Sequence, residues 1–173
     1  KKEIKEYKTN GTIDICYSIY NEPLMDPRIF TFISRTREIL GDTGRPFIIT
    51  NGTYLNQTIL NELVEVGLKI LWVSSYSPEE EKYFYSLRAP EELTYYVIPF
   101  APLQVISDTY TRSIQNHTKS CGSPLSVICI RCNGDVILCC RDFESSKVFG
   151  NVLEESLIEI INKGEMNQVR DDL

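Results

Sequence analysis

"PFIITNGTYLNQTILNELVEVGLKILWVSS", residues 46–75, decides the fold, because it reads as a strand, a helix and a second strand joined by short connections. The two ends of this stretch, residues 46–50 and 69–75, are apolar runs typical of buried strands. Between them, apolar residues recur at helical spacing at Ile59, Leu60, Leu63 and Val64, and Gly67 is the predicted end of this helix. A strand–helix–strand unit of this kind predicts a parallel sheet in an α/β fold.

The same alternation continues on both sides of this unit. Residues 12–19 form a β-rich run, and residues 94–100 predict a fourth strand. A helix is predicted from Asp26, as the N-cap, to Gly41, with its inner face made by Ile29, Phe32, Ile33, Thr36 and Leu40. Ser77 and the following proline predict the start of another helix. A last helix is predicted over residues 153–164, with an inner face made by Leu153, Leu157, Ile160 and Ile161. The polar stretch between Phe100 and Cys121 predicts a domain boundary, giving domains 1–110 and 111–173.

Composition excludes several classes of function. The chain has 18 Lys and Arg against 24 Asp and Glu, a net charge of -6 without a basic cluster, so we expect no nucleic-acid partner. No apolar run approaches the roughly 20 residues that span a bilayer, so we expect no membrane partner. The charged start of the chain does not resemble a signal peptide, which favours a cytoplasmic location. Because Lys1 is not a methionine, we also expect a piece of a longer protein.

Six cysteines, five of them between positions 121 and 140, require an explanation. A two-residue turn at Asn133-Gly134 predicts a hairpin that pairs Ile130 with Ile137. Alternation along that hairpin places Cys132 and Cys139 on one side, about 13 Å apart, with Cys129 and Cys140 on the other. We therefore expect that these four cysteines cannot form one compact site.

The cysteines allow three interpretations. Structural zinc would use Cys129 and Cys132, but an extended Cys-x-x-Cys lacks the tight turn that zinc sites use. A disulfide between Cys139 and Cys140 would close a strained ring. Cys16, Cys129 and Cys132 are therefore interpreted as small buried hydrophobic residues, which leaves Cys121, Cys139 and Cys140 to be explained. The single histidine, His117, lies in a polar stretch and is given no role.

The C-terminal region resembles a known family. The stretch "CGSPLSVICIRCNGDVILCCRDF" and the "FGNVLEESLIEIINKG" that follows resemble the SPASM-type extension of radical S-adenosylmethionine enzymes, from a Cys-x-x-Pro start through an Asn-Gly-x-Val hairpin to Cys-Cys-x-Asp and Gly-Asn-Val. In that family the first cysteine and members of the pair ligate an auxiliary 4Fe-4S cluster. The resemblance implies that Cys121 and one or both of Cys139 and Cys140 are metal ligands.

The upstream region resembles the catalytic part of the same family. "SIYNEPLMDPRI" is similar to its Gly-Glu-Pro segment, "ITNGTYL" to its Thr-Asn-Gly segment and "LWVSSYS" to its serine-containing fourth strand. The resemblance implies that Glu22 accepts from the methionyl ammonium of S-adenosylmethionine. It also implies further cofactor-binding candidates for the ribose and the carboxylate, namely Asn51, Ser74, Ser75 and Arg88. The fold implied is a partial parallel β/α barrel followed by a hairpin-and-helix extension.

One family feature is absent. No Cys-x-x-x-Cys-x-x-Cys loop occurs, and Cys16 has no cysteine near it, so the catalytic cluster is expected upstream of Lys1. Tyr20-Asn21 also replaces the glycines that precede the Glu-Pro pair in the family. The intact protein is expected to be an oxidoreductase that cleaves S-adenosylmethionine to a 5′-deoxyadenosyl radical, while the chain as given is expected to be inactive.

The sequence supports two functional hypotheses. In the first, the enzyme abstracts hydrogen from a peptide, a protein or a small molecule and takes electrons from a donor such as flavodoxin or ferredoxin. In the second, the same fold is a non-catalytic scaffold that binds a peptide or protein partner. The two hypotheses differ in whether iron is bound and in what precedes Lys1.

Overall fold

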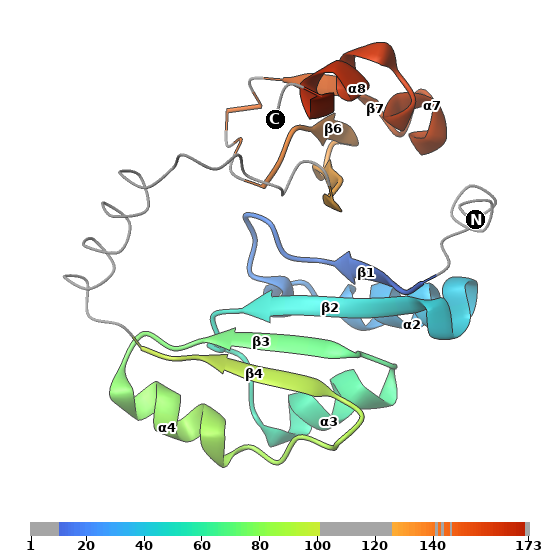
Figure 1. Cartoon of the computed structure of the whole chain (residues 1–173). Helices are drawn as coiled ribbons and strands as arrows, with labels where there is room; N and C mark the ends of the chain where they lie inside the picture. The colour runs from blue at the N-terminus through green and yellow to red at the C-terminus, as the bar shows by residue number, and fades with distance from the viewer. Residues whose placement is uncertain (1–10, 101–125, 141, 143, 146, 172–173) are drawn as a thin grey trace. The chain divides into compact units, whose positions relative to one another are not determined.

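A computed structural model describes residues 11–100, 126–140, 142, 144–145 and 147–171 (Figure 1). The chain divides into two compact units, Lys1–Ile106 and Ser107–Leu173, and each is described by itself. The boundary predicted after residue 110 lies outside the described residues and stays a prediction. Within these described ranges no helix is both long and apolar enough to cross a membrane.

The first unit contains a parallel four-stranded sheet with the strand order β1-β2-β3-β4 (Figure 1). Every neighbouring pair is parallel, as the strand–helix alternation predicted. The strands are β1 (Ile13–Cys16), β2 (Gly44–Thr50), β3 (Ile70–Ser74) and β4 (Thr94–Ile98). Three consecutive parallel pairs bring the carboxyl ends of all four strands to one edge, which is where sheets of this type bind ligands.

Helices connect the strands, and most of their boundaries follow the predicted caps. They are η1 (Pro23–Met25), α2 (Ile29–Leu40), η2 (Gly41–Thr43), α3 (Gln57–Glu65) and α4 (Pro78–Ser86). Ser77 caps α4 by accepting from the N–H of Glu80, as predicted. The predicted N-cap of α2 is wrong, because the helix begins at Ile29. The Asp26 carboxylate instead accepts from the N–H and the guanidinium of Arg28 in a turn ahead of the helix.

The core of the first unit lies between the helices and one face of the sheet. Ile48, Leu71 and Val73 on the strands are fully buried, and so are Leu60 and Leu63 on α3, as predicted for that helix. These residues belong to one cluster that also includes residues of α2 and α4. Phe32, predicted on the inner face of α2, is 41% exposed. The helix therefore buries a narrower stripe, centred on Ile33.

The second unit is a small antiparallel sheet followed by two helices. Its elements are β5 (Cys129–Ile130), β6 (Asp135–Ile137), β7 (Val148–Asn151), α7 (Leu157–Ile161) and α8 (Gly164–Asp171). Val136 and Phe149 of the sheet pack with Ile160, Ile161 and Met166 of the helices. The predicted inner-face position of Leu153 is wrong, because Ser156 begins α7 with a capping box and leaves Leu153 ahead of the helix and 80% exposed.

The hairpin register differs by one residue from the predicted pairing. Ile137 pairs with Cys129 instead of Ile130, and the connection is a three-residue loop, Cys132-Asn133-Gly134. Gly134 has φ +92, whereas the φ angle of Asn133 is not positive. A two-residue type I′ turn requires positive φ at both central positions, whereas a three-residue loop needs it only at its final glycine. The conformation of Asn133 therefore selects the longer loop.

Candidate functional site

A pocket of about 290 Å³ opens at the carboxyl ends of β1, β2 and β3. Its wall is mostly polar, and the aliphatic side chains in it are Ile19, which follows β1, and Ile49 of β2. The lining residues are Ser18, Ile19, Asn21, Glu22, Ile49, Thr50, Asn51, Ser74 and Tyr76. The pocket therefore combines the ends of three strands that are far apart in the sequence.

Glu22 is the acidic group of this pocket, and three donors hold its carboxylate in place. Oε1 accepts from the hydroxyl of Thr50 at 2.6 Å and from the N–H of Leu24 at 3.1 Å, while Oε2 accepts from the N–H of Asn51 at 2.7 Å. Local sequence contributes to this geometry, because Glu22 is the N-cap of η1. A carboxylate has about four acceptor sites, so capacity remains for a donor in the pocket.

The turn after β2 is fixed by side chains and by a glycine. The buried Thr50 hydroxyl accepts from the N–H of Gly52 at 3.0 Å, and the Asn51 side chain accepts from the N–H of Thr53 at 2.9 Å. Gly52 has φ +75, and a Cβ at this position would overlap the ring of Phe84. Only glycine meets both conditions. The turn thereby holds the Asn51 N–H toward Glu22.

The structure brings together three of the five residues predicted to bind a cofactor. Glu22, Asn51 and Ser74 line the pocket. Ser75 is 8% exposed, and its hydroxyl donates to the carbonyl of Ile98 at 2.8 Å, so it joins the ends of β3 and β4. Arg88 is exposed beyond the end of α4, where its backbone N–H and carbonyl pair with the side chain of Gln57. Ser75 and Arg88 do not line the pocket.

Sequence reasoning missed four polar residues of the pocket wall, and one of them is the Thr50 that donates to Glu22. Ser18 bonds to both the N–H and the carbonyl of Ile49, at 2.9 and 2.7 Å, and so extends the β1–β2 contact past the last strand residue. Asn21 donates to the carbonyl of Tyr17 at 3.2 Å and closes its own loop. Tyr76 is 65% exposed beside Ser74. A polar residue directly after an apolar strand was the available signal for Ser18.

Tyr17 anchors the end of β1 to the first helix. Its hydroxyl donates to the carbonyl of Phe32 at 3.0 Å and bonds to Thr36, and its N–H donates to the carbonyl of Phe47. Burial raises the pKa of the Tyr17 hydroxyl, while the bond to Thr36 acts in the opposite direction. The residue stays a neutral donor at physiological pH, so it holds the following Ser18 in place.

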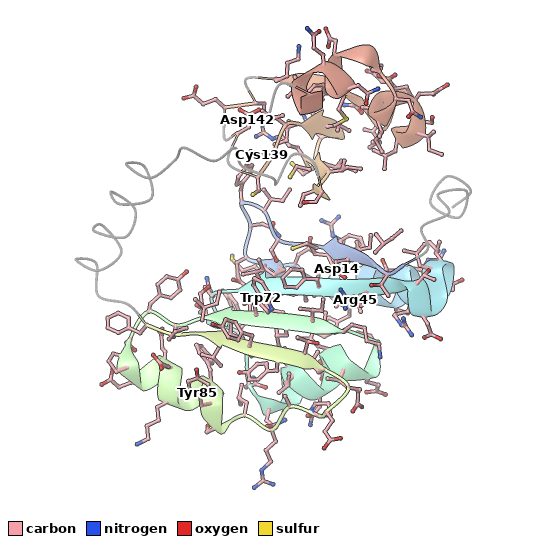
Figure 2. All side chains as sticks on the ribbon, in the orientation of Figure 1. Asp14, Arg45, Trp72, Tyr85, Cys139 and Asp142 are labelled. Carbon is pink, nitrogen blue, oxygen red and sulfur yellow. The ribbon has the colours of Figure 1, made fainter. Side chains whose placement is uncertain are left out.

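The cysteine pair lies at the end of the hairpin in the second unit. Cys139 is half-buried and Cys140 is exposed, and both are free thiols. The segment after them reverses, because the Cys139 carbonyl accepts from the N–H of Asp142 at 3.1 Å and the Asp142 carboxylate accepts from the N–H of Lys147 at 3.3 Å (Figure 2). Ser145 has φ +53 in this reversal, and Arg131 of the hairpin bonds to its hydroxyl.

The predicted ligand set is only partly described. Cys121 lies outside the described residues, so its distance to Cys139 and Cys140 stays a prediction. Within the described part of the chain, no three His, Cys, Asp or Glu side chains gather as a metal site. Soft thiolates are nevertheless the donors that iron–sulfur clusters use, so the chemistry of the pair fits such a cluster.

The other cysteines divide in a way that partly corrects the prediction. Cys129 is 3% exposed, as expected for a small hydrophobic residue. The burial predicted for Cys16 and Cys132 is wrong, because both are exposed. Cys132 lies in the three-residue hairpin loop. Cys16 pairs with Phe47, so it lies on the face of the sheet that the helices do not cover.

Parts of the chain are similar to known proteins. Residues 121–173 match the SPASM family, described as an iron-sulfur cluster-binding domain. The S-adenosyl-L-methionine-dependent 2-deoxy-scyllo-inosamine dehydrogenase of Niallia circulans is 24% identical over 164 residues, which are 90% of this chain and 65% of the dehydrogenase. An uncharacterized protein of Methanocaldococcus jannaschii is 37% identical over 70 residues, or 40% of this chain and 23% of that protein.

Two solved structures share the fold. BtrN in an open conformation has a TM-score of 0.68 at 23% identity, and the match covers 92% of this chain and 64% of that one. BtrN in complex with AdoMet and 2-DOIA has a TM-score of 0.72 at 24% identity, covering 92% and 66%. The predicted resemblance to radical S-adenosylmethionine enzymes with a SPASM extension is confirmed. The chain spans slightly less than two thirds of the length of these relatives.

Proposed function

We propose that this chain is part of a radical S-adenosylmethionine oxidoreductase, that its pocket binds S-adenosylmethionine, and that residues 121–173 bind an auxiliary 4Fe-4S cluster. The observation that carries the proposal is the Glu22 carboxylate, which three hydrogen bonds fix at the carboxyl edge of a parallel sheet. Ligands of α/β sheets bind at this edge. The S-adenosyl-L-methionine dependence of the Niallia circulans dehydrogenase supports the choice of ligand.

The pocket residues divide the recognition of the cofactor among them. Glu22 offers its remaining acceptor capacity to the methionyl ammonium, and Thr50 and Asn51 keep that carboxylate from rotating. Asn51 and Ser74 offer side-chain donors and acceptors to the ribose and the carboxylate. Ser75 and Arg88 stay candidates from the sequence alone, without support from the geometry of the pocket.

The chemistry that the bound cofactor supplies is one-electron reductive cleavage to methionine and a 5′-deoxyadenosyl radical, which abstracts a hydrogen atom from the substrate. This chain contributes orientation and shielding, because the reacting atoms belong to the cofactor and the substrate. The cysteines of the catalytic cluster are proposed to lie upstream of Lys1. The chain on its own is therefore proposed to bind without reacting.

The auxiliary cluster is proposed on Cys121 and one or both of Cys139 and Cys140. The match to an iron-sulfur cluster-binding domain supports it, as does the reversal that Asp142 stabilises directly after the pair. Electrons would come from a donor such as flavodoxin or ferredoxin. The substrate is proposed to be a small molecule rather than a peptide, in line with the named substrate of the Niallia circulans dehydrogenase.

Calorimetric titration with S-adenosylmethionine tests the pocket directly. The wild-type chain is compared with Glu22→Gln, which keeps the shape and most hydrogen bonds but removes the charge that pairs with an ammonium. We expect Glu22→Gln to weaken binding by about tenfold or more, the loss of one charge-assisted hydrogen bond. The matched control is Glu62→Gln, an exposed glutamate of α3 away from the pocket, which we expect to bind as the wild type does.

Two outcomes would contradict the proposal. Equal affinity of the wild type and Glu22→Gln would remove Glu22 from the site. Failure of the wild-type chain to bind S-adenosylmethionine at all, with circular dichroism showing that it is folded, would leave the non-catalytic scaffold as the better interpretation.

A further inference from the structure

The loop that follows β1, residues 17–22, forms one wall of the pocket. Ser18, Ile19, Asn21 and Glu22 of this loop line the pocket. Glu22, the acidic residue of the wall, lies at the end of the loop. The position of its carboxylate therefore depends on the course of the loop as well as on the donors that β2 supplies.

The loop begins where a side chain takes over the pairing of β1 with β2. Cys16 and Phe47 form the last register pair, and the N–H of Tyr17 still donates to the carbonyl of Phe47 at 3.0 Å. The next bonds to β2 come from the Ser18 hydroxyl, which donates to the carbonyl of Ile49 at 2.7 Å and accepts from its N–H at 2.9 Å. The main chain can therefore leave the sheet after Ser18 without leaving these two backbone groups unpaired.

Asn21 fixes the turn that comes next. Its Nδ2 donates to the carbonyl of Tyr17 at 3.2 Å, and its Oδ1 accepts from the N–H of Ile19 at 3.3 Å. One side-chain amide thus joins both sides of the turn directly ahead of Glu22. The φ angle of Asn21 is not positive, so the backbone does not require a glycine at this position. Asn21 stands where the family pattern has a glycine, so these two bonds are a feature of this chain.

The geometry of this loop decides whether the Glu22 carboxylate reaches its donors. The donor groups are the N–H of Leu24 in η1 and, after β2, the Thr50 hydroxyl and the Asn51 N–H. These groups belong to two segments, and the carboxylate accepts from all of them only while the loop keeps η1 beside the end of β2. A loop that first had to become ordered would reduce the affinity for a ligand, because its ordering opposes binding.

We propose that Ser18 and Asn21 are positioning residues, which hold the loop so that the Glu22 carboxylate already lies at its binding position in the free protein. They act through Glu22 rather than by contact with the ligand. The inference rests on the proposed function, since it takes S-adenosylmethionine as the ligand of the pocket. It adds the residues that preorganise the site and separates their role from that of the carboxylate.

Calorimetric titration of the full chain with S-adenosylmethionine measures the role of the two residues. Asn21→Ala is expected to weaken binding about fivefold, because its two bonds are solvent-exposed and each contributes modestly. Asn21→Gly should weaken it about tenfold, since glycine also frees the backbone. Ser18→Ala should weaken it about tenfold as well, because it leaves two backbone groups without their partner. The matched control is Asn61→Ala, because Asn61 of α3 accepts from Gln57 at 2.9 Å and does not line the pocket.

A double-mutant cycle separates positioning from a general loss of structure. The titrations with Asn21→Ala and Ser18→Ala are repeated in chains that also carry Glu22→Gln. If the two residues act through the charge of Glu22, each substitution should weaken binding less than about twofold in that background. A residue that only stabilises the unit, or that touches the ligand itself, would cause the same fold-change in both backgrounds.

Amide exchange in the free chain tests the same role without a ligand. The N–H groups of Leu24 and Asn51 both donate to the Glu22 carboxylate, so their exchange reports on its position. NMR of the labelled full chain is expected to show about fivefold faster exchange at both amides in Asn21→Ala. The internal control is the N–H of Ile59, which donates to the side chain of Asn56 at 3.0 Å in the cap of α3 and should not change.

The outcomes distinguish this inference from the proposed function. If S-adenosylmethionine binds in a Glu22-dependent way but the variants of Ser18 and Asn21 bind as tightly as the wild type, the inference is overturned and the proposed function stands. Equal fold-changes in the two backgrounds of the cycle would overturn it as well. If the wild type does not bind S-adenosylmethionine, the proposed function fails. Faster exchange at Leu24 and Asn51 in Asn21→Ala would then still support the positioning of Glu22, and unchanged exchange would overturn it.

Discussion

The two units of the chain reach order by different means. In the described residues, the first unit has strands of four to seven residues and a cluster of twelve buried side chains, while the second has strands of two to four residues and a cluster of five. The pocket of the first unit is formed by the protein alone. In the second unit, no three His, Cys, Asp or Glu side chains gather as a metal site within the described part of the chain. Apolar burial therefore organises one candidate site, whereas the other is expected to depend on its cluster.

Loading the full chain with iron and sulfide under anaerobic conditions should produce the largest difference between the units. Binding to a site that the unfolded chain lacks adds directly to folding free energy. We expect amide exchange in residues 126–171 to slow by on the order of 100-fold on loading, with exchange in β2 and β3 unchanged. Hydrogen exchange followed by mass spectrometry measures both regions in one sample.

Cysteine variants control for that experiment. Cys139→Ser combined with Cys140→Ser should abolish the gain in protection, whereas Cys16→Ser should not, because Cys16 is an exposed cysteine of the other unit. An equal gain in protection in both units would show that the cluster does not act on the second unit alone, which would contradict the expected difference between the units.

A core substitution should destabilise the first unit, whereas iron loading should stabilise the second. Leu71 is fully buried in β3, so Leu71→Ala removes packing and leaves a cavity, at a cost of about 2–5 kcal/mol in the free energy of unfolding. Urea unfolding followed by Trp72 fluorescence reports on this unit. Leu153→Ala, at a leucine that is 80% exposed in the second unit, is the matched control and should leave the transition unchanged. A loss below about 1 kcal/mol would indicate a loosely packed core.

Removal of the Asn151 side chain, which bonds to the hairpin loop, should have an effect of intermediate size on the stability of the second unit. The Asn151 amide donates to the carbonyl of Asn133 and to Asp135, both at 3.0 Å, and its oxygen accepts from the N–H of Leu153 at 2.8 Å. Asn151→Ala should cost about 1–2 kcal/mol and raise the exchange rate of the hairpin amides. Asn167→Ala, at an exposed position of α8, should not. Unchanged hairpin exchange in Asn151→Ala would show that the loop holds its conformation without this residue.

The difference between the two units also explains which structural features could be predicted from the sequence. Repeated strand–helix periodicity depends on local spacing, so the parallel sheet and the caps at Ser77 and Gly41 could be predicted. The hairpin register could not, because Asn133-Gly134 is compatible with two loop lengths and the choice depends on a backbone angle at Asn133. Leu153 was misplaced for a similar reason, since the capping box at Ser156 outweighs its helical spacing.

Within the candidate site, the sequence indicated residues that carry a motif and gave no signal for those that depend on distant contacts, while the binding roles themselves stay predictions. Glu22, Asn51 and Ser74 carry the family pattern and meet in the pocket. The bond between Glu22 and Thr50 joins residues that are 28 positions apart, and periodicity gives no signal for it. The ring contacts among Phe47, Trp72 and Tyr96 could not be predicted either, because alternation indicates which residues share a face but not which face stays uncovered.

The smallest expected effect concerns alkaline pH and the first unit alone. Burial, with a further contribution from Tyr83 and Tyr85, raises the pKa of Tyr95 to about 12. The unfolded chain loses this proton near pH 10 and the folded chain only near pH 12, so the contribution to stability is complete below pH 10 and is lost as the pH rises through that window. Tyr95→Phe should show a flatter decline in stability over this range, measured by urea unfolding at a series of pH values.

Tyr95→Phe should also lower the free energy of unfolding at neutral pH, and this loss provides a check on the alkaline effect. The Tyr95 hydroxyl donates to the carbonyl of Phe84 at 2.9 Å, so Tyr95→Phe should lose about 1 kcal/mol there and less above pH 11. Residues 126–171 contain no tyrosine, so tyrosinate absorbance contains no contribution from the part of the second unit that the structure describes. If hydrogen exchange in residues 126–171 declined in protection in parallel with the Tyr95 transition, the two units would unfold together. Independent behaviour would show that each unit is stabilised by its own contacts, which is the condition under which iron can act on one and a core substitution on the other.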